Sequence, residues 1–177
     1  MNFDKVYDTL VEYHALCEAA LATTPDGKPE CSYLSPGPPP WDSYPCLVVW
    51  PGGPSLGDTF PLTPALAPMH RVTVNSMVDL VSITATILRC APQLGEDGVT
   101  LPTPAEYAQA TRQTSADLWS VWNFIAAKKR RGDFLAPRER ELQLPPAVAV
   151  NQEGGACGWQ VTILTQIDGY DPGEDGP

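Results

Sequence analysis

Few side chains in this sequence are of the types that perform catalysis or bind metals. There are two histidines, His14 and His70, so a Ser-His-Asp or Cys-His centre would have to use one of them. His14 stands three residues before Cys17 on the apolar side of a predicted helix, but a zinc site there would lack a second pair of ligands. The pattern favours packing of His14 in the core or at an interface over metal binding.

Two motifs resemble ligand-binding loops but have the wrong spacing. The stretch "GGPSLGDT", residues 52 to 59, has glycines around a serine, but no lysine follows its second glycine as a phosphate-binding loop requires. The acidic "DGYDPGEDG" near the C-terminus does not fit a calcium loop, because Tyr170 and Pro172 fall where ligands or helical backbone are needed. No GxSxG or HExxH motif is present. We therefore predict no enzymatic activity, no cofactor and no metal.

The remaining candidates are contact residues. The basic run at 128 to 131 ends a predicted helix in a chain of net charge −10, which favours a complement to the helix dipole over a phosphate-binding patch. Trp119, Trp122 and Phe124 cannot all be buried in one direction from one helix, so one of them is expected to contact a neighbouring subunit. We name as subunit or partner contacts Trp41, Trp50, Phe60, Trp122, Lys128, Lys129, Arg130 and Arg131.

Composition excludes several classes of protein. With 11 basic and 21 acidic side chains, the chain should repel the phosphates of duplex DNA over most of its surface. It has no apolar run long enough to span a membrane and no visible secretory signal. Five cysteines, an odd number without a CxxC pair, indicate reduced thiols of a protein made in the cytosol. Residues 1 to 177 are expected to form a single domain.

Two segments have the pattern of amphipathic helices that would hold these residues. In residues 2 to 22 one apolar face carries Phe3, Tyr7, Leu10, His14, Cys17 and Leu21. In residues 103 to 133, Thr103 and Glu106 form a capping box, Pro104 suits the first turn and Gly132 ends the helix. The predicted buried line of this helix contains Tyr107, Ala110 or Thr111, Thr114, Leu118, Val121 or Trp122, and Ile125.

The other periodic segments predict strands. Residues 46 to 50 are apolar throughout, as in a strand buried on both faces, and residues 159 to 167 alternate in the manner of a half-buried strand. Residues 70 to 90 predict one long strand or two, and residues 140 to 151 a strand interrupted by Pro145 and Pro146. The fold class predicted is α+β, a mixed or antiparallel sheet of about four to five strands covered by an N-terminal helix and a long central helix.

Proline marks the expected loops. The chain has 20 prolines, about twice the average usage, and they cluster in residues 23 to 45 and 51 to 68. Loops above about 12 residues in a compact domain usually serve a function, and proline lowers the entropy lost on docking. We therefore predict that the Pro-rich loops at 35 to 45 and 51 to 68 contact neighbouring subunits, and that residues 168 to 177 form a polar C-terminal tail.

The order of the predicted helices and strands, and the residue pattern along the whole chain, resemble those of the tail terminator proteins, or head–tail joining proteins, of long-tailed bacteriophages. The resemblance is strongest to those of actinobacterial phages. The resemblance lies in "PPPWDSYPCLVVW" after the first helix, in "HRVTVNSMVDLVSITATI" before a helix with "DLWSVWNFI", and in the closing "GGACGWQVTILTQIDGYDP". It implies a structural protein of the virion without catalysis, made in the host cytoplasm. It also implies a homo-oligomeric ring, commonly of six subunits, at the head-proximal end of the tail.

The resemblance further implies three kinds of contact. The ring would cap the tail tube protein and join it to the head–tail connector or stopper protein, and DNA would pass through without specific binding. A stopper or tail-completion protein remains open as an alternative, because the pattern hardly separates these modules. An alternative of another class is a small cytosolic enzyme or ligand-binding domain that uses the loop at residues 52 to 58.

Overall fold

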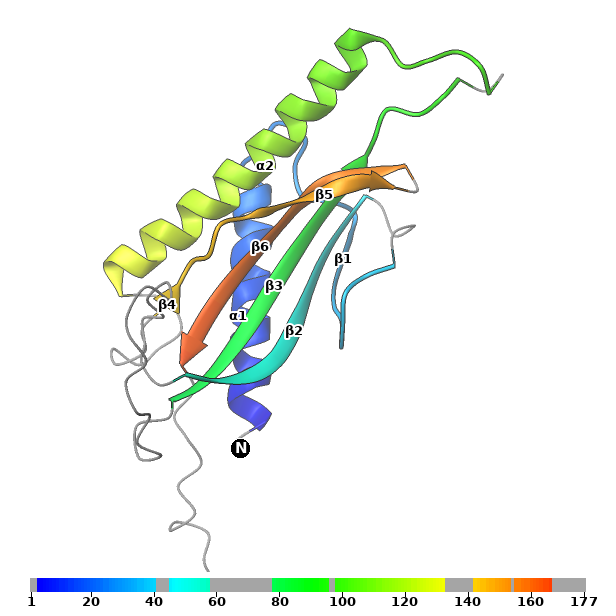
Figure 1. The fold of residues 1–177 in the computed structure, drawn as a ribbon. Helices are drawn as coiled ribbons and strands as arrows, with labels where there is room; N and C mark the ends of the chain where they lie inside the picture. The colour runs from blue at the N-terminus through cyan, green and yellow to red at the C-terminus, as the bar shows by residue number, and fades with distance from the viewer. Residues whose placement is uncertain are drawn as a thin grey trace, which may run out of the picture.

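The part of the chain that the structure describes forms a six-stranded sheet with two helices on one of its faces (Figure 1). The structure, a computed structural model, describes residues 3–40, 45–57, 78–95, 98–132, 142–153 and 155–166. The strand order is β1-β2-β3-β6-β4, and β5 also pairs with β6. Among the described strands only β1 and β2 run parallel, so the sheet is mixed, and the predicted α+β class with its two covering helices is confirmed. None of the helices among the described residues is long and apolar enough to cross a membrane.

The first helix, α1, runs over Phe3–Leu21, close to the predicted 2 to 22. Its buried line passes through Tyr13, Leu16 and Ala20 and includes Leu10, Cys17 and Leu21, as expected. Tyr7, predicted to be buried, is 59% exposed, and His14 is half-buried, because both lie at the margin of this line. The Tyr13 hydroxyl donates a hydrogen bond of 2.9 Å to the Val161 carbonyl oxygen, which ties α1 to the centre of the sheet.

The second helix, α2, runs over Pro104–Arg131 and has the predicted ends. Thr103 and Glu106 form the capping box, and Gly132 ends the helix with a φ of 68°, in the left-handed region that glycine tolerates best. The buried residues of α2 are Ala110, Asp117, Val121 and Ile125. Tyr107 was expected in this line but is 42% exposed, because burial begins only at Ala110. Thr111 is likewise exposed, so Ala110 holds the buried position of that pair.

Strand β2 is longer than its apolar segment. It covers Cys46–Gly57 and pairs antiparallel with β3, Val78–Cys90. Residues 46 to 49 are buried on both faces, as predicted. The strand then continues through Pro51 and Pro54, which corrects the predicted loop at 51 to 68, since residues 51 to 57 are strand. Prolines are tolerated there because β1 pairs only with residues 46 to 49, and the register shifts between Pro51 and Pro54. Residues 58 to 77 lie outside the described residues.

A strand that the sequence did not reveal lies inside the predicted Pro-rich loop at 23 to 45. Strand β1, Cys31–Leu34, pairs in parallel with the start of β2. The chain must return along the sheet before a parallel partner can begin, which takes about a dozen residues. This crossover accounts for the length of residues 35 to 45, so their length is no longer an argument for a docking arm.

The C-terminal strands complete the sheet. Strands β4, Leu142–Gln143, and β5, Val148–Glu153, lie on either side of the predicted interruption at Pro145 and Pro146. Strand β6, Ala156–Gln166, pairs with β3, β4 and β5. Its Val161 and Ile163 are fully buried as expected, whereas Trp159 is half-buried. A Cβ atom at Gly158 would lie 1.8 Å from the Ile87 carbonyl oxygen, so this position requires glycine. The predicted tail at 168 to 177 lies outside the described residues.

A buried ion pair fastens α2 to the sheet. The Arg89 guanidinium on β3 donates from Nε to Asp117 Oδ2 at 2.8 Å and from Nη2 to Asp117 Oδ1 at 3.0 Å. Nη2 also donates to the Gly27 carbonyl oxygen at 2.6 Å, in the turn that follows α1. Both residues are almost fully buried, Arg89 at 5% exposed and Asp117 at 1%. One side-chain pair therefore connects the sheet, α2 and the end of α1.

Candidate assembly surface

Residues 91–95 and 98–103, which we call the arm, lie between β3 and α2 and project from the body of the molecule (Figure 1). The arm is anchored at its base, where the Ala91 amide donates to the Gly155 carbonyl oxygen at 2.7 Å, and at its end by the Thr103 cap. Between them it turns at Gly98, whose amide donates to the Gly95 carbonyl oxygen at 2.8 Å. The arm is therefore a turned-back segment whose two ends are fixed.

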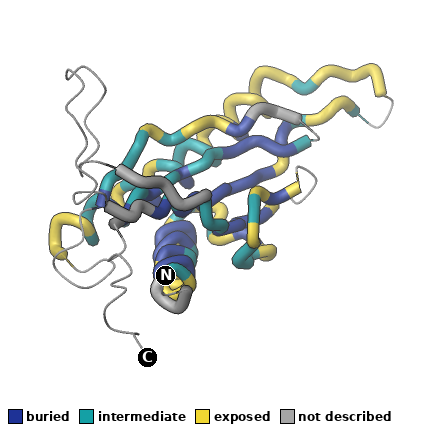
Figure 2. The backbone as a smooth tube through the Cα atoms, turned by 60° about the horizontal axis from the view of Figure 1, so that its bottom comes forward, coloured by how far each residue is buried: buried dark blue, intermediate teal, exposed yellow. Residues whose placement is uncertain are grey.

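The arm carries exposed aliphatic side chains. Leu94 is 53% exposed, Leu101 75% and Val99 79%. Figure 2 shows the contrast in burial, with the central strands mostly buried and the projecting arm mostly exposed. Single exposed apolar residues are ordinary on protein surfaces, but three on one projecting segment are characteristic of a contact site.

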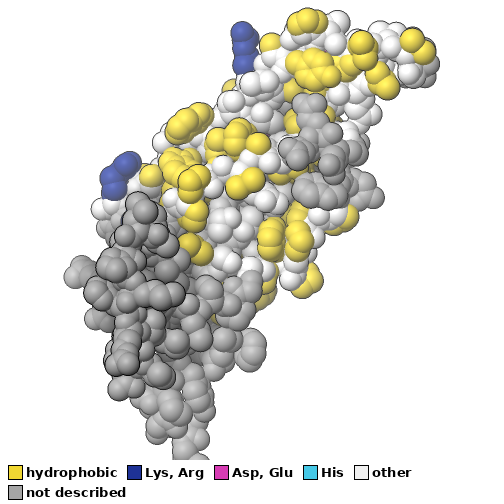
Figure 3. All heavy atoms as spheres, viewed as in Figure 1, with side chains coloured by type: hydrophobic (Ala, Val, Ile, Leu, Met, Phe, Trp, Pro, Cys, Tyr) yellow, Lys and Arg dark blue, Asp and Glu magenta, His cyan; other side chains and the backbone are white. Residues whose placement is uncertain are grey.

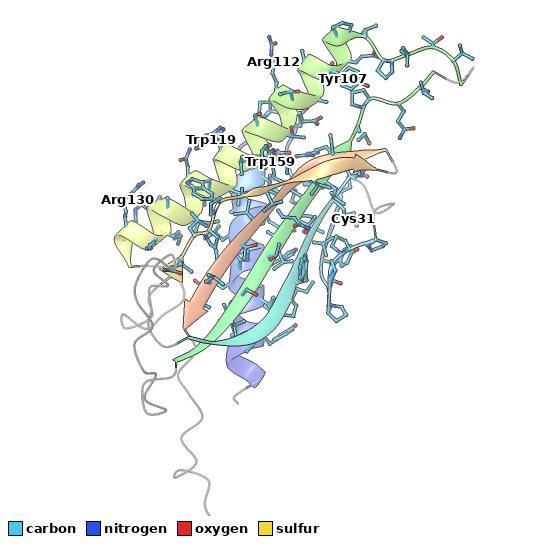
Figure 4. All side chains as sticks on the ribbon, viewed as in Figure 1. Cys31, Tyr107, Arg112, Trp119, Arg130 and Trp159 are labelled. Atoms are coloured by element: carbon cyan, nitrogen blue, oxygen red, sulfur yellow. The ribbon has the colours of Figure 1, made fainter. Side chains whose placement is uncertain are left out.

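A second exposed feature is the side of α2 opposite its buried line. Arg112, Trp119 and Arg130 are spaced by about two and about three turns of 3.6 residues, so they lie on one line of the helix. We call these three residues the outer stripe. Trp119 is 59% exposed, and both arginines are exposed. Figure 4 shows the three side chains along the same side of α2, with the arginines pointing away from the sheet. An exposed tryptophan between arginines has the composition of a protein-binding hot spot.

Hydrophobic and basic side chains occur together on this face of the molecule. Figure 3 shows dark-blue basic side chains at the outer edge of α2 and hydrophobic side chains beside them. On the part of this face that the structure describes, no acidic side chain is visible (Figure 3). The face thus differs from the chain as a whole, which has 21 acidic and 11 basic residues.

The fold determines how far each of the predicted aromatic contact residues is exposed. Trp122 is half-buried and packs against the main hydrophobic core, whereas Trp119 on the same helix is 59% exposed. Trp50 is half-buried on β2, and its Nε1 donates a hydrogen bond of 3.0 Å to Thr86 Oγ1. Trp41 and Phe60 lie outside the described residues. The sequence indicated that one aromatic residue of this helix would contact a neighbouring subunit. Trp119 has the larger exposed surface for such a contact, and Trp122 as a subunit contact stays a prediction.

The basic run at the end of α2 divides into two parts. Lys129 Nζ donates a hydrogen bond to the Leu142 carbonyl oxygen in β4, and Lys128 is half-buried. Arg130 and Arg131 are exposed. All four lie in the last turn, where positive charge stabilises the helix dipole. The dipole interpretation therefore fits the position of the run, and Arg130 also belongs to the outer stripe.

His14 and the cysteines have structural surroundings. His14 Nε2 lies 2.7 Å from Ser32 Oγ, linking α1 to β1, and burial lowers the pKa of the imidazole. Burial raises the pKa of the Cys17 thiol well above its ordinary value. Among the residues that the structure describes, there is no group of three or more metal-ligating side chains. The position of His14 is thus explained by packing and by its contact with Ser32.

Four of the five cysteines lie in neighbouring pairs, which their scattered positions in the sequence did not indicate. Cys31 and Cys46 are directly opposite on β1 and β2, and burial together with the Cys31 thiol raises the pKa of Cys46 to about 12. Cys157 Sγ lies 3.7 Å from the Cys90 carbonyl oxygen on the adjacent strand. All are free thiols, and Cys46 stays protonated at neutral pH, which makes it a poor nucleophile.

Sequence reasoning missed the arm and the outer stripe. The signal for the arm was present in "CAPQLGEDGVTLPTP", where leucine and valine stand among turn-forming residues and have no periodic partner. For the stripe the signal was the spacing of Arg112, Trp119 and Arg130. No protein-family model matches the chain, and no curated protein matches it significantly. The arm and the outer stripe therefore cannot be compared with the same positions of a relative.

Proposed function

We propose that this protein is a structural subunit of a homo-oligomeric ring, a tail terminator at the head-proximal end of a long phage tail. The observation that carries the proposal is the arm, with exposed Leu94, Val99 and Leu101 on a segment that leaves the body of the subunit. Covering these three side chains requires another surface, and a neighbouring copy in a ring supplies one at fixed geometry.

The resemblance to tail terminators supports the same conclusion from the order of elements along the chain. In this role the ring caps the tail tube and joins it to the head connector, and the acidic composition keeps DNA from binding during its passage. A stopper or tail-completion protein would present the same kind of arm, so the choice of terminator among these modules rests on the resemblance alone.

The alternative of a ligand-binding domain relied on a loop at residues 52 to 58, and most of this segment is a strand. Residues 52 to 57 belong to strand β2, and a Cβ atom at Gly52 would lie 1.9 Å from Ser82 Oγ on β3. This glycine is therefore explained by close approach of neighbouring strands, with no need for a ligand.

The proposal is tested by native mass spectrometry and negative-stain microscopy of the purified protein. We expect closed rings at high protein concentration or in the presence of tail tubes. Replacing Leu94, Val99 and Leu101 together by serine should abolish the rings and leave the circular dichroism spectrum unchanged. The matched control is Ala105→Ser with Ala108→Ser, at exposed positions in the first turns of α2. A wild-type protein that stays monomeric under both conditions would contradict the proposal.

A further inference from the structure

Cys31 and Cys46 face each other across two neighbouring strands of the sheet. They are directly opposite in the parallel register of β1 and β2. Opposite residues of neighbouring strands lie about 4.8 Å apart and point to the same face, and the Cα atoms of a disulfide lie about 4.4 to 6.8 Å apart. The two cysteines therefore meet the distance requirement of a disulfide without a change of register.

The two thiols interact but differ in exposure. Cys31 is exposed, whereas Cys46 is fully buried. Burial, followed by the hydrogen bond with the Cys31 side chain, raises the pKa of Cys46 to about 12, so the Cys46 sulfur stays protonated at neutral pH. Figure 4 shows Cys31 on the side of the molecule where β1 forms the edge of the sheet. Cys31 is therefore the thiol that a dissolved oxidant reaches first.

The second pair of neighbouring cysteines lacks this geometry. On β3 and β6 the partner of Cys157 is Arg89 and the partner of Cys90 is Ala156, so the two cysteines are out of register by one residue. Successive residues of a strand point to opposite faces of the sheet, so the Cys90 and Cys157 side chains leave the sheet on opposite faces. As in the first pair, one cysteine is exposed and the other is buried. Cys90 is therefore a matched control for Cys31.

We propose that Cys31 and Cys46 are an oxidant-responsive pair, which hydrogen peroxide converts into a disulfide between β1 and β2. The Cys31 sulfur, as a thiolate, attacks one peroxide oxygen, the O–O bond breaks, and a sulfenic acid at Cys31 and a water form. The Cys46 sulfur then attacks the Cys31 sulfur and the S–O bond breaks. The hydroxyl group leaves with the Cys46 proton as a second water. The two thiols together lose two electrons and two protons, which reduce the peroxide to water.

The disulfide fastens the edge strand of the sheet. Strand β1 has 4 residues and, among the described strands, pairs only with β2, so it has few contacts that resist local opening. A bond between residues 31 and 46 closes a loop in the unfolded chain and lowers its entropy, which stabilises the folded protein. Thiols stay reduced in the cytosol and form disulfides outside it. A virion subunit meets this change on release from the cell; this timing rests on the proposed function, whereas the disulfide does not.

Peptide mapping after treatment of the folded protein with hydrogen peroxide tests the proposal. Chymotrypsin cleaves after Tyr33 and Trp41, so it places the two cysteines on different peptides. We expect the oxidised wild type to lose two of its five thiols and to yield peptides linked through Cys31 and Cys46, which dithiothreitol separates. Cys90→Ser should yield the same linked peptides, and Cys31→Ser should yield none.

Thermal unfolding gives a second measurement. The oxidised wild type should unfold at a midpoint about 5 °C or more above that of the reduced protein, and dithiothreitol should reverse the shift. Cys31→Ser should show no such shift with peroxide. Because Cys31 is exposed, this variant should unfold close to the midpoint of the reduced wild type, so the loss of the shift is not a loss of folding.

Three results would overturn the proposal. Linked peptides that join Cys31 of one chain to Cys31 of another would show that the exposed thiol reacts between chains. A sulfinic acid at Cys31 beside an unreacted Cys46 thiol would show that the buried sulfur does not reach its partner. Peptides linked through Cys90 and Cys157 in place of the expected pair would show that strand register does not select the bond. Each of these results leaves the proposed ring standing, because the ring is tested by the native mass of the reduced protein.

Discussion

The two sides of α2 show how one helix serves stability and surface contact separately. Its inner side carries Asp117, Val121 and Ile125, all buried, and is fastened to β3 by the bidentate pair with Arg89. Its outer side carries Arg112 and Trp119, both exposed. The difference follows from the helical period, because residues half a turn apart face opposite directions. Substitutions on the two sides should consequently fail in different ways.

The largest effect is expected beneath the inner side, at the centre of the sheet. Val161 is fully buried on β6, and its carbonyl oxygen accepts the Tyr13 hydroxyl. Val161→Asp places an unpaired charge there and should cost roughly 4 kcal/mol or more of the free energy of unfolding. We expect insoluble protein, whereas Val161→Ala should remain soluble with a lower unfolding midpoint. Soluble, cooperatively unfolding Val161→Asp protein would contradict the assignment of a buried centre.

The next largest effect concerns the buried ion pair. Asp117→Ala leaves the Arg89 guanidinium buried without its carboxylate and should lower the free energy of unfolding by about 3 to 5 kcal/mol. Replacing both residues, as Arg89→Met with Asp117→Leu, should recover most of this loss because no buried charge is left. Urea unfolding of the two variants measures the difference. An equal loss in both would mean that packing volume, and not the unpaired charge, dominates.

Two tryptophans one turn apart sharpen the comparison. Trp122 packs against the core, so Trp122→Ser should lower the free energy of unfolding by about 2 kcal/mol. Trp119 is 59% exposed, so Trp119→Ser should change it by less than about 0.5 kcal/mol while weakening assembly. Chemical unfolding and sedimentation of both variants separate the effects. If Trp119→Ser destabilises the monomer as much as Trp122→Ser does, the separation of α2 into a stabilising inner side and an exposed outer side is wrong.

The smallest effect is a pH dependence at the edge of the core. Burial lowers the pKa of His14 below its usual value, against the opposing effect of Glu18 and together with that of Lys28. As the pH falls, His14 therefore takes up a proton at a higher pH in the unfolded chain than in the folded protein. The free energy of unfolding consequently decreases as the pH drops below about 6.5. His14→Gln can keep the contact with Ser32 without titrating, so urea unfolding at pH 7.5 and 5.5 should show a smaller loss than in the wild type. Equal losses would assign the pH dependence to other groups.

Local patterns in the sequence were sufficient to predict the positions and the ends of the helices. The capping box of Thr103 and Glu106 and the stop at Gly132 act within one turn, so they can be read without knowledge of the fold. The apolar run at 46 to 50 predicted a strand for the same reason, since burial on both faces leaves no polar position in such a segment. Each of these features depends on neighbours in the chain.

Pairing partners distant in the chain decided the rest. Strand β1 and the extension of β2 through Pro51 and Pro54 exist because β2 and β3 supply hydrogen-bond partners that no local pattern contains. Tertiary packing likewise decided that Trp122 turns toward the core and Trp119 toward solvent. The sequence by itself determined which segments are helical, where α2 begins and ends, and the charge of each helix. Only the tertiary structure decided which sides of those helices remain uncovered, because burial depends on what the rest of the chain places against them.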